Sequence, residues 1–430
     1  MSSTSIFMRS LAVLSVVVAK MVTQQMLAAQ SHAADKPAMA FERLAMIESN
    51  PQSRTPGARL IELNENKDIA AVAMYGCKTV FWNLKTNAAI GEPAQQSGDA
   101  GAIGFITNSN LAYTADWDSM QLLNEETGLK TGRGFPHRLR EDSVLAPAIS
   151  PNGKVLVTRN QMNSLQFWNL KTHASIRPEY THDSTVSKLQ FSPDNKWFFS
   201  NANSLNIWNP MTGELVAESI QNNIYATAYL PTGQYLVTFE HDRKDSSSKS
   251  KVMIRSGAAD WKIVRQFELP GQARHAEWID QNQLLIVGTA VGEKFTTIGF
   301  VVHLNQSPPN FDVVFKNDYP IADYAITKDR QHLVTIFNRK LSCWKFGETK
   351  PKWEQTWAGK HWRKQVFSTA SDWVMAHALG ENAIAYSIED GTELWRKREV
   401  IYAKTDGNHI LVTDKHGAEV WQWTVPTTAN

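Results

Sequence analysis

The chain has 430 residues, of which 42% are hydrophobic and 10% aromatic, with 15 Trp among them. A chain of this length can bury a large core, either as two or three ordinary domains or as one array of repeats. Its 44 Lys and Arg nearly balance its 42 Asp and Glu, so it lacks the basic excess typical of nucleic-acid-binding proteins, and we expect no nucleic-acid partner.

Residues 1–33 have the order of a secretory signal peptide. They contain no acidic residue, Arg9 precedes an apolar run over 11–19, and Ser31-His-Ala33 offers small residues to a signal peptidase. We therefore predict cleavage after Ala33 and a periplasmic or secreted protein. The alternative is a retained membrane anchor, but Lys20 interrupts the apolar run well short of the ~20 residues that a spanning helix needs. We expect no stable membrane insertion after cleavage.

The mature chain is formally neutral, with 42 basic and 42 acidic residues, and keeps only Cys77 and Cys343. These two cysteines are 266 residues apart, and the sequence cannot decide whether they pair. Two buried free thiols are the simpler interpretation. So few cysteines exclude a small scaffold held together by disulfides.

Short turn sequences rich in Asn, Asp, Gly and Pro recur along the chain, and their starts lie 36 to 50 residues apart. Each follows an apolar run, and most are followed by two more runs with the periodicity of β-strands, such as 155–158 and 165–168. The turns are at 64–68, 107–110, 150–154, 192–196, 230–234, 280–283, 327–331, 369–372 and 405–409.

Repeats of about 40 to 45 residues with four short strands each predict an all-β chain folded as a β-propeller of four-stranded antiparallel blades. We count nine units; eight is the main alternative, if a unit around 273–318 is wrongly divided. The last unit, 401–424, has three strands, and a strand near 41–47 is expected to supply the fourth and close the ring. Large aromatic residues at the ends of third strands are expected to fill the wedges between blades: Trp82, Trp168, Trp208 and Trp344.

These assignments divide the chain into a signal peptide (1–33), an N-terminal segment with the closing strand (34–57), the β-propeller (58–427) and a short tail (428–430).

The stretch FSPDNKWFFSNANSLNIWNPMTGELV (191–216) resembles a repeat of the WD-repeat propeller family, and the resemblance covers nearly all of 41–427. The residue pattern at the strand ends of that family recurs in two other segments, FWNLKTNAAIGE (81–92) and QFWNLKTHASIRPE (166–179). Thr-His-Asp-Ser at 181–184 resembles its Gly-His loop. In that family His, Ser, Trp and Asp form a structural hydrogen-bond relay. The resemblance implies this role for His182, Ser200 and Trp208. The Asp is unmatched, with Asn201 and Asn203 nearby, so the chain is a divergent member.

A second segment, AIAYSIEDGTELWRK (383–397), resembles the tryptophan-docking motif of quinoprotein-type propellers. The matching positions are Ala385, Asp390, Gly391 and Trp395. Quinone-dependent dehydrogenases of that family carry several such motifs and acidic calcium ligands, whereas this chain has one good copy and no Asp-rich loop. The motif therefore indicates fold rather than quinone chemistry.

The sequence contains no metal-ligand spacing, nucleophile elbow, phosphate loop or dinucleotide fingerprint, so we predict no metal site, no cofactor and no catalytic residue. A catalytic site assembled from distant blades would leave no such motif. Loops that enter blades or join their second and third strands should share one face, and several mix aromatic residues with Arg, a composition typical of interfaces. The candidate partner-binding residues on this face are Trp117, Asp118, Arg138, Arg140, His241, Arg243, His361, Trp362 and Arg363.

Two functions remain open. The first is an exported, non-enzymatic propeller that binds a protein partner through this loop face, an inference from fold-level analogy. The alternative is a propeller enzyme or small-ligand binder that uses the central channel, with quinoprotein-like or hydrolytic chemistry. Acidic or His side chains that converge at the channel mouth would favour the alternative.

Overall fold

The structure is a computed structural model of the chain. The residues that it describes are 40–49, 56–116, 118–136, 147–160, 163–186, 188–202, 204–218, 224–229, 235–240, 249–257, 261–291, 296–337, 340–356, 364–368 and 370–424.

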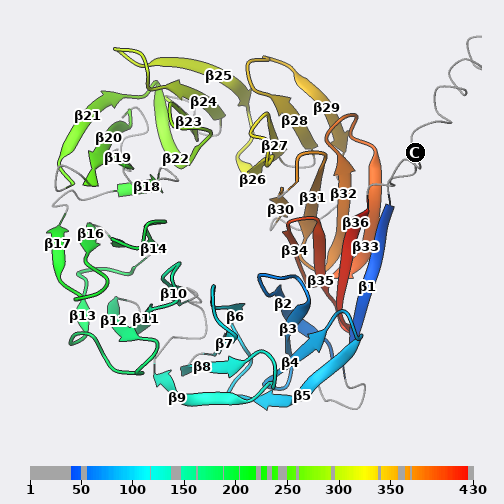
Figure 1. Cartoon of the computed structure of the whole chain (residues 1–430). Helices are drawn as coiled ribbons and strands as arrows, with labels where there is room; N and C mark the ends of the chain where they lie inside the picture. The colour runs from blue at the N-terminus through cyan, green and yellow to red at the C-terminus, as the bar shows by residue number, and fades with distance from the viewer. Residues whose placement is uncertain are drawn as a thin grey trace, which may run out of the picture. The chain divides into compact units, whose positions relative to one another are not determined.

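The named elements of these residues are all β-strands, and they form nine four-stranded antiparallel sheets arranged as a ring (Figure 1). We number the sheets as blades 1 to 9 along the chain. Blades 1 to 3 are β2–β5 (Ala58–Leu63, Ile69–Met74, Lys78–Asn83, Ala88–Gln95), β6–β9 (Ala102–Phe105, Leu111–Ala115, Ser119–Asn124, Lys130–Pro136) and β10–β13 (Ala148–Ile149, Val155–Asn160, Ser164–Asn169, Tyr180–Thr181).

Blades 4 to 6 are β14–β17 (Lys188–Phe191, Phe198–Asn201, Leu205–Trp208, Leu215–Glu218), β18–β21 (Ile224–Tyr229, Tyr235–Glu240, Lys251–Ser256, Ile263–Glu268) and β22–β25 (Gly271–Trp278, Gln283–Ala290, Thr297–His303, Asn310–Asn317). Blades 7 and 8 are β26–β29 (Ile321–Ile326, His332–Phe337, Lys340–Lys345, Pro351–Thr356) and β30–β33 (Lys364–Phe367, Trp373–Ala378, Glu381–Ser387, Glu393–Val400). The first strand of each blade is innermost and the fourth outermost (Figure 1).

Blade 9 is built from both ends of the chain. Its sheet order is β1-β36-β35-β34, with β1 at Ala40–Glu48, β34 at Tyr402–Asp406, β35 at His409–Thr413 and β36 at Gly417–Thr424. The prediction that an N-terminal strand closes the ring is confirmed, as is the count of nine blades. The uncertain region around 273–318 contains one complete blade, β22–β25, so the eight-bladed alternative is wrong.

The core lies between blades rather than within one. The second strands β3, β31 and β35 are buried along their whole length, whereas outermost strands such as β5 and β21 are largely exposed. Both faces of each sheet are apolar because each face packs against a neighbouring blade. At the closure, Ile47 of β1 packs in one cluster with Val72 of blade 1 and Val420 of blade 9.

Four of the recurring turns between first and second strands share one hydrogen-bonding pattern. In the Ser-Pro-Asp-Asn turn, Ser192 Oγ accepts a hydrogen bond from the amide of Trp197 at 2.9 Å, and Asn195 has a left-handed φ of 61°. Such turns place a polar acceptor before the chain reverses and a residue that tolerates positive φ within it. The same five-residue pairing occurs at Asn64–Ile69, Ser150–Val155 and Thr327–His332.

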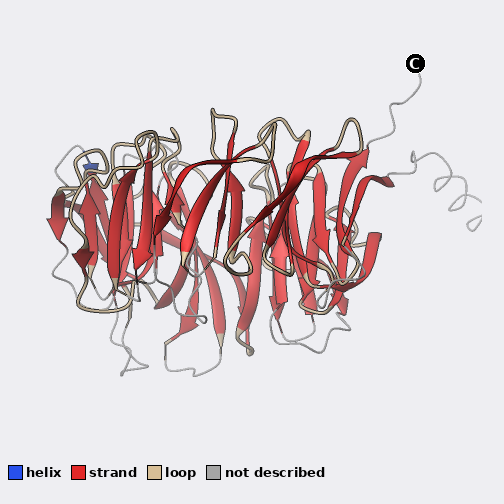
Figure 2. Ribbon diagram, turned by 90° about the horizontal axis from the view of Figure 1, so that it is seen from below, coloured by secondary structure: helices blue, strands red, loops and turns tan. Residues whose placement is uncertain are grey.

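The chain separates into two compact units, one of residues 43–422 and one of residues 1–42 with 423–430. The first contains the ring, in which strands stand side by side between two faces of loops (Figure 2). In the second, the rings of Phe41 and Trp423 lie 4.7 Å apart. Among the described residues no helix is long and apolar enough to cross a membrane. Cys77 and Cys343 are both free thiols. Cys343 is buried, as the simpler interpretation expected, but Cys77 is half-buried and lies in the turn before β4, so that part of the interpretation is wrong.

Candidate functional site

Most of the loop face predicted to bind a partner lies outside the described residues. Of the nine candidate residues, the structure describes Asp118, which is exposed between β7 and β8. Its amide donates to the buried Asp116 at 2.9 Å. Burial alone would raise the pKa of Asp116, but hydrogen bonds from Ser97 and neighbouring amides outweigh it and lower that pKa. The residues that lie outside are Trp117, Arg138, Arg140, His241, Arg243, His361, Trp362 and Arg363.

The three relay residues lie together, with Ser200 and Trp208 on strands of blade 4 and His182 in the connection from blade 3 to blade 4. His182 Nε2 is 2.9 Å from Ser200 Oγ, and Trp208 Nε1 donates to the same oxygen at 2.8 Å. All three side chains are buried, and burial lowers the pKa of His182 to about 4. Two other third-strand tryptophans also donate to a second-strand hydroxyl at 2.9 Å, a role that sequence reasoning missed: Trp168 to Thr158 and Trp344 to Thr335.

The segment that resembles a tryptophan-docking motif takes part in a contact between blades. Gly391, in the turn between β32 and β33, has a φ of 73° and lies beneath the indole of Trp353 from blade 7. Trp353 Nε1 donates to the carbonyl of Ile388 at 2.9 Å. The docked tryptophan is thus Trp353, which the sequence analysis did not single out, while Trp395 lies against Trp421 with ring centroids 5.6 Å apart.

Contacts of this type recur around the ring. A side chain at the outer edge of one blade donates a hydrogen bond to a backbone carbonyl in the turn between the third and fourth strands of the next blade. The Arg177 Nη1–Gly213 O distance is 2.6 Å and the Trp353 Nε1–Ile388 O distance is 2.9 Å. The donor and acceptor pairs are Arg177 with Gly213, Arg265 with Leu304, and Trp353 with Ile388.

The sheet register places three residues at one equivalent position in blades 5, 6 and 7. Arg265, Asp312 and Trp353 each pair with the third-strand residue that lies two before that strand's end. Arg265 and Trp353 are N–H donors that reach the following blade. An ionised carboxylate can only accept hydrogen bonds, so Asp312 cannot make the equivalent contact to blade 7.

The acceptor side of this junction is nevertheless present in blade 7. Leu304, Phe346 and Ile388 each follow directly after the third strand, and the amide of each donates to the first turn of its own blade. The carbonyl of Gly391 in blade 8 accepts a second hydrogen bond from blade 7, from Gln355 Nε2 at 2.9 Å. Thr349 stands at the same position in blade 7, because both residues are fourth after the third strand. Within the described part of the chain, no side chain donates to the carbonyls of Phe346 or Thr349.

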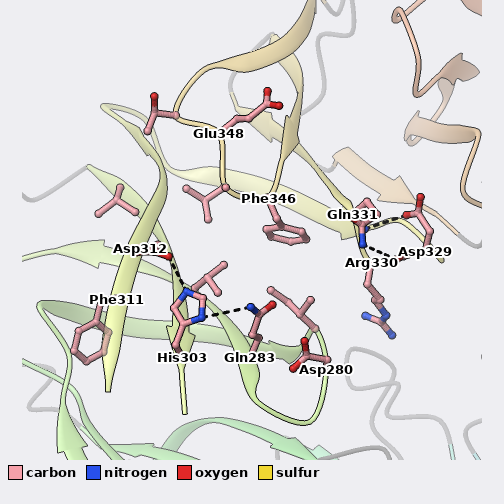
Figure 3. A pocket seen from close by; sticks show the side chains of 16 residues that line it. Asp280, Gln283, His303, Phe311, Asp312, Asp329, Arg330, Gln331, Phe346 and Glu348 are labelled. Atoms are coloured by element: carbon pink, nitrogen blue, oxygen red, sulfur yellow. Dashed lines mark hydrogen bonds and ion pairs between the residues drawn. The ribbon is translucent and has the colours of Figure 1, made fainter. Parts of the chain in front are cut away.

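A pocket of about 980 Å³ occupies this open junction between blades 6 and 7. Phe346 and Thr349 line it from blade 7, and Phe311, Asp312 and Val313 line it from β25 (Figure 3). Val313 is 48% exposed, as are apolar residues on other outermost strands, such as Val264 on β21 at 51%. We call this space the blade 6–7 pocket.

Acidic groups dominate the polar lining of the blade 6–7 pocket. Asp312 Oδ2 lies 2.7 Å from His303 Nε2, and Figure 3 shows the two side chains directed toward each other. Arg330 also borders the pocket, but its guanidinium is held by Glu277 at 2.6 Å. Lys345 Nζ lies 3.7 Å from Glu348. The carboxylates that line the pocket are Asp280, Asp312, Asp329 and Glu348. The site is suited to bind a cationic hydrogen-bond donor.

A second group of ionisable side chains lies on the innermost strands of blades 6 and 7. Burial lowers the pKa of His275, and the charge of Asp323 partly offsets this. Burial also raises the pKa of Asp323, and a hydrogen bond from the amide of Val366 at 2.9 Å partly offsets this rise. A cavity of about 370 Å³ lies beside His275 and Thr297. In the part of the chain that is described, no three His, Cys, Asp or Glu side chains are placed to hold a metal ion.

No protein-family model matches the chain, and no curated protein matches its sequence. Its likenesses are to solved structures. The computationally designed Ika8 protein is 14% identical, with a TM-score of 0.50, over 89% of this chain and 99% of the other. A structure of the eukaryotic initiation factor is 13% identical, with a TM-score of 0.59, over 86% and 96%. At these identities the likeness concerns the fold alone, and it supports a β-propeller. The nine sheets of the structure make the chain a nine-bladed β-propeller.

Proposed function

We propose that this protein is an exported, non-enzymatic propeller of WD-repeat type that acts as a scaffold for protein–protein interaction. The observation that carries the proposal is the blade 6–7 pocket. A closed ring holds the pocket walls rigidly, and the pocket presents backbone acceptors and carboxylates where neighbouring junctions are filled by the protein's own side chains. Rigid surfaces with unfilled acceptors favour a partner that supplies the donors, because little ordering is needed on binding.

The remaining parts of the proposal rest on the sequence. Two features support kinship with WD-repeat propellers: the relay residues at blade 4, and the residue pattern at the strand ends in 81–92 and 166–179. The pattern of residues 1–33 supports export. The loop face with Trp117 and Trp362 offers a second surface for a partner, because aromatic and Arg side chains are enriched at interfaces.

A channel-side ligand is the alternative, and one observation favours it. His275, on the innermost strand of blade 6, lines a cavity together with Arg274, Thr297 and apolar residues, and the charge of Asp323 on the innermost strand of blade 7 acts on it. Such a pair can bind a small polar ligand or transfer a proton.

Partner capture tests the scaffold proposal. The full chain, tagged at its C-terminus, is crosslinked in its own cells, and partners are identified by mass spectrometry. The matched variants are Asp312→Arg, which fills the pocket, and Glu92→Arg, which makes the same charge change at an exposed site on β5.

We expect a near-stoichiometric partner with the wild type and Glu92→Arg, and its loss with Asp312→Arg. A Trp117→Ala, Trp362→Ala variant tests the loop face in the same way. Absence of any stoichiometric partner would count against a scaffold. Loss of a small-molecule ligand in His275→Ala and Asp323→Asn would support the channel-side alternative.

A further inference from the structure

Resting on the proposed function, we infer that the partner presents an arginine on an extended segment. Its guanidinium enters the blade 6–7 pocket in the place that Arg265 and Trp353 occupy at the neighbouring junctions. The pocket is therefore a docking position completed by a second protein rather than by the chain itself.

The first argument is the equivalence of the three junctions. The guanidinium of Arg265 donates to the carbonyls of Leu304 and Gln306, in the turn after the third strand of blade 6. Phe346 stands at the position of Leu304 in blade 7 and lines the pocket. A guanidinium at the same place has two donor edges, one for the turn carbonyls and one for another acceptor.

The second argument is the residue that replaces the donor. Asp312 stands where Arg265 and Trp353 stand in blades 5 and 7. Its carboxylate is 57% exposed, and the 2.7 Å contact with His303 fixes its orientation. A carboxylate held in this way can accept two parallel hydrogen bonds from arginine, whereas lysine offers only a point charge. Aspartate at this position thus favours arginine from another chain.

The third argument concerns the walls. Arg177 shows how an arginine docks in this fold: its aliphatic stem covers Gly213, and its guanidinium lies 5.2 Å from the ring centre of Trp208. In the blade 6–7 pocket, Phe311 and Phe346 can receive the stem of an incoming arginine. The exposed Val313 lies on β25, the last strand of its sheet, where an extended segment would cover it.

Binding of defined peptides to the full chain tests the inference. The probes are fluorescein-labelled peptides of sequence Gly-Thr-Val-X-Val-Thr-Gly, in which X is Arg, Lys or Ala, and the readout is fluorescence anisotropy. We expect the Arg peptide to bind at least tenfold more tightly than the Lys peptide, and the Ala peptide to bind more weakly still.

Three variants locate the site. Asp312→Arg supplies a donor from the chain itself and is expected to abolish binding. Asp312→Asn keeps the shape of the side chain and is expected to weaken binding of the Arg peptide at least tenfold. Glu92→Arg is expected to bind as the wild type does. Because Asp312→Asn keeps the size and shape of the side chain while it removes the charge and replaces one acceptor oxygen with an NH2 group, it remains informative if Asp312→Arg folds poorly.

Equal affinity for the three peptides, no binding of any of them, or unchanged binding to both Asp312 variants would overturn the arginine inference. The scaffold proposal fails on a different result, the absence of a partner in the crosslinking experiment. One further result distinguishes the two proposals. If the wild type captures a partner that Asp312→Arg loses, but the Arg peptide is not preferred, the scaffold proposal stands and only the arginine inference fails.

Discussion

Ser200, on the second strand of blade 4, joins the third strand of that blade to the connection that precedes it. Its hydroxyl oxygen accepts a hydrogen bond from Trp208 Nε1, so its own hydrogen can be donated to His182 Nε2. A neutral imidazole can accept that hydrogen bond at its unprotonated nitrogen. The sequence placed these residues in a relay through a family resemblance, and the structure brings them within hydrogen-bonding distance. The missing acidic member of the relay is compatible with this geometry because the imidazole is kept neutral by burial.

We expect Ser200→Ala to destabilise the protein by roughly 1–3 kcal/mol, because it leaves two buried polar groups without their shared partner. Chemical denaturation measures the loss. Ser204→Ala, which removes only a long 3.4 Å contact in the same blade, is the control and should cost much less. Equal losses in the two variants would contradict a relay role for Ser200.

His182 should also make stability depend on pH. Its pKa is about 4 in the folded protein against an ordinary 6.5, so between these values the unfolded chain binds the proton and the folded protein does not. Stability is complete above pH 6.5 and is lost progressively as the pH falls toward 4, by up to roughly 3 kcal/mol. Denaturation of the wild type and His182→Gln at pH 7 and 4 checks this, and the variant should lose less over that interval. Parallel losses would show that other groups cause the pH dependence.

At the scale of the elements, turns as well as strands make contacts between blades. Gly391 and Gly380 share a φ of 73°, but they differ in surroundings: Gly391 lies under Trp353, whereas Gly380 faces open space. The sequence indicated Gly391 as part of a docking motif. It could not indicate that Trp353, from the preceding blade, is the residue that docks, because that pairing depends on how blades stack.

Substitution of these two glycines distinguishes the cost of a left-handed backbone from the cost of a steric clash with Trp353. We expect Gly380→Ala to cost about 1 kcal/mol, since left-handed backbone disfavours any Cβ. Gly391→Ala should cost an additional ~1–3 kcal/mol, because its Cβ would lie 2.7 Å from the Trp353 ring. Thermal and chemical denaturation measure both. Similar costs for the two variants would argue against docking of Trp353 on Gly391.

At the scale of the whole molecule, closure of the ring depends on β1. Ile47 is 1% exposed, and the closure is reinforced between blades 9 and 1 by ion pairs, with 2.5 Å between Lys404 and Glu62. We expect Ile47→Ala to destabilise the protein by about 2–4 kcal/mol because it leaves a cavity in this cluster. Ile263→Ala, at a 39% exposed site on β21, is the control and should cost far less. A small effect of Ile47→Ala would mean that the ring does not rely on this strand.

Export is a prediction for the whole chain as well. If residues 1–33 are a signal peptide, the intact mass of the protein isolated from its own cells corresponds to a chain that begins at Ala34. A mass that includes residues 1–33 would instead support the retained anchor.

The sequence by itself determined the fold class and indicated the closing strand, because these follow from local periodicity, turn chemistry and a roughly fixed repeat length. It counted nine units but left eight blades open, and the structure decided for nine because β22–β25 form one complete sheet. The resemblance of 181–216 to a WD repeat also indicated His182, Ser200 and Trp208, because the family's relay residues lie close together in the sequence. Only the tertiary structure decided how Arg265, Asp312 and Trp353 correspond, and that an aspartate leaves the junction of blades 6 and 7 open. Their equivalence depends on sheet register and on stacking between blades, where a donor in one repeat meets an acceptor about 35 to 40 residues farther along the chain. No single repeat contains both halves of such a contact, so local patterns could not predict the pocket.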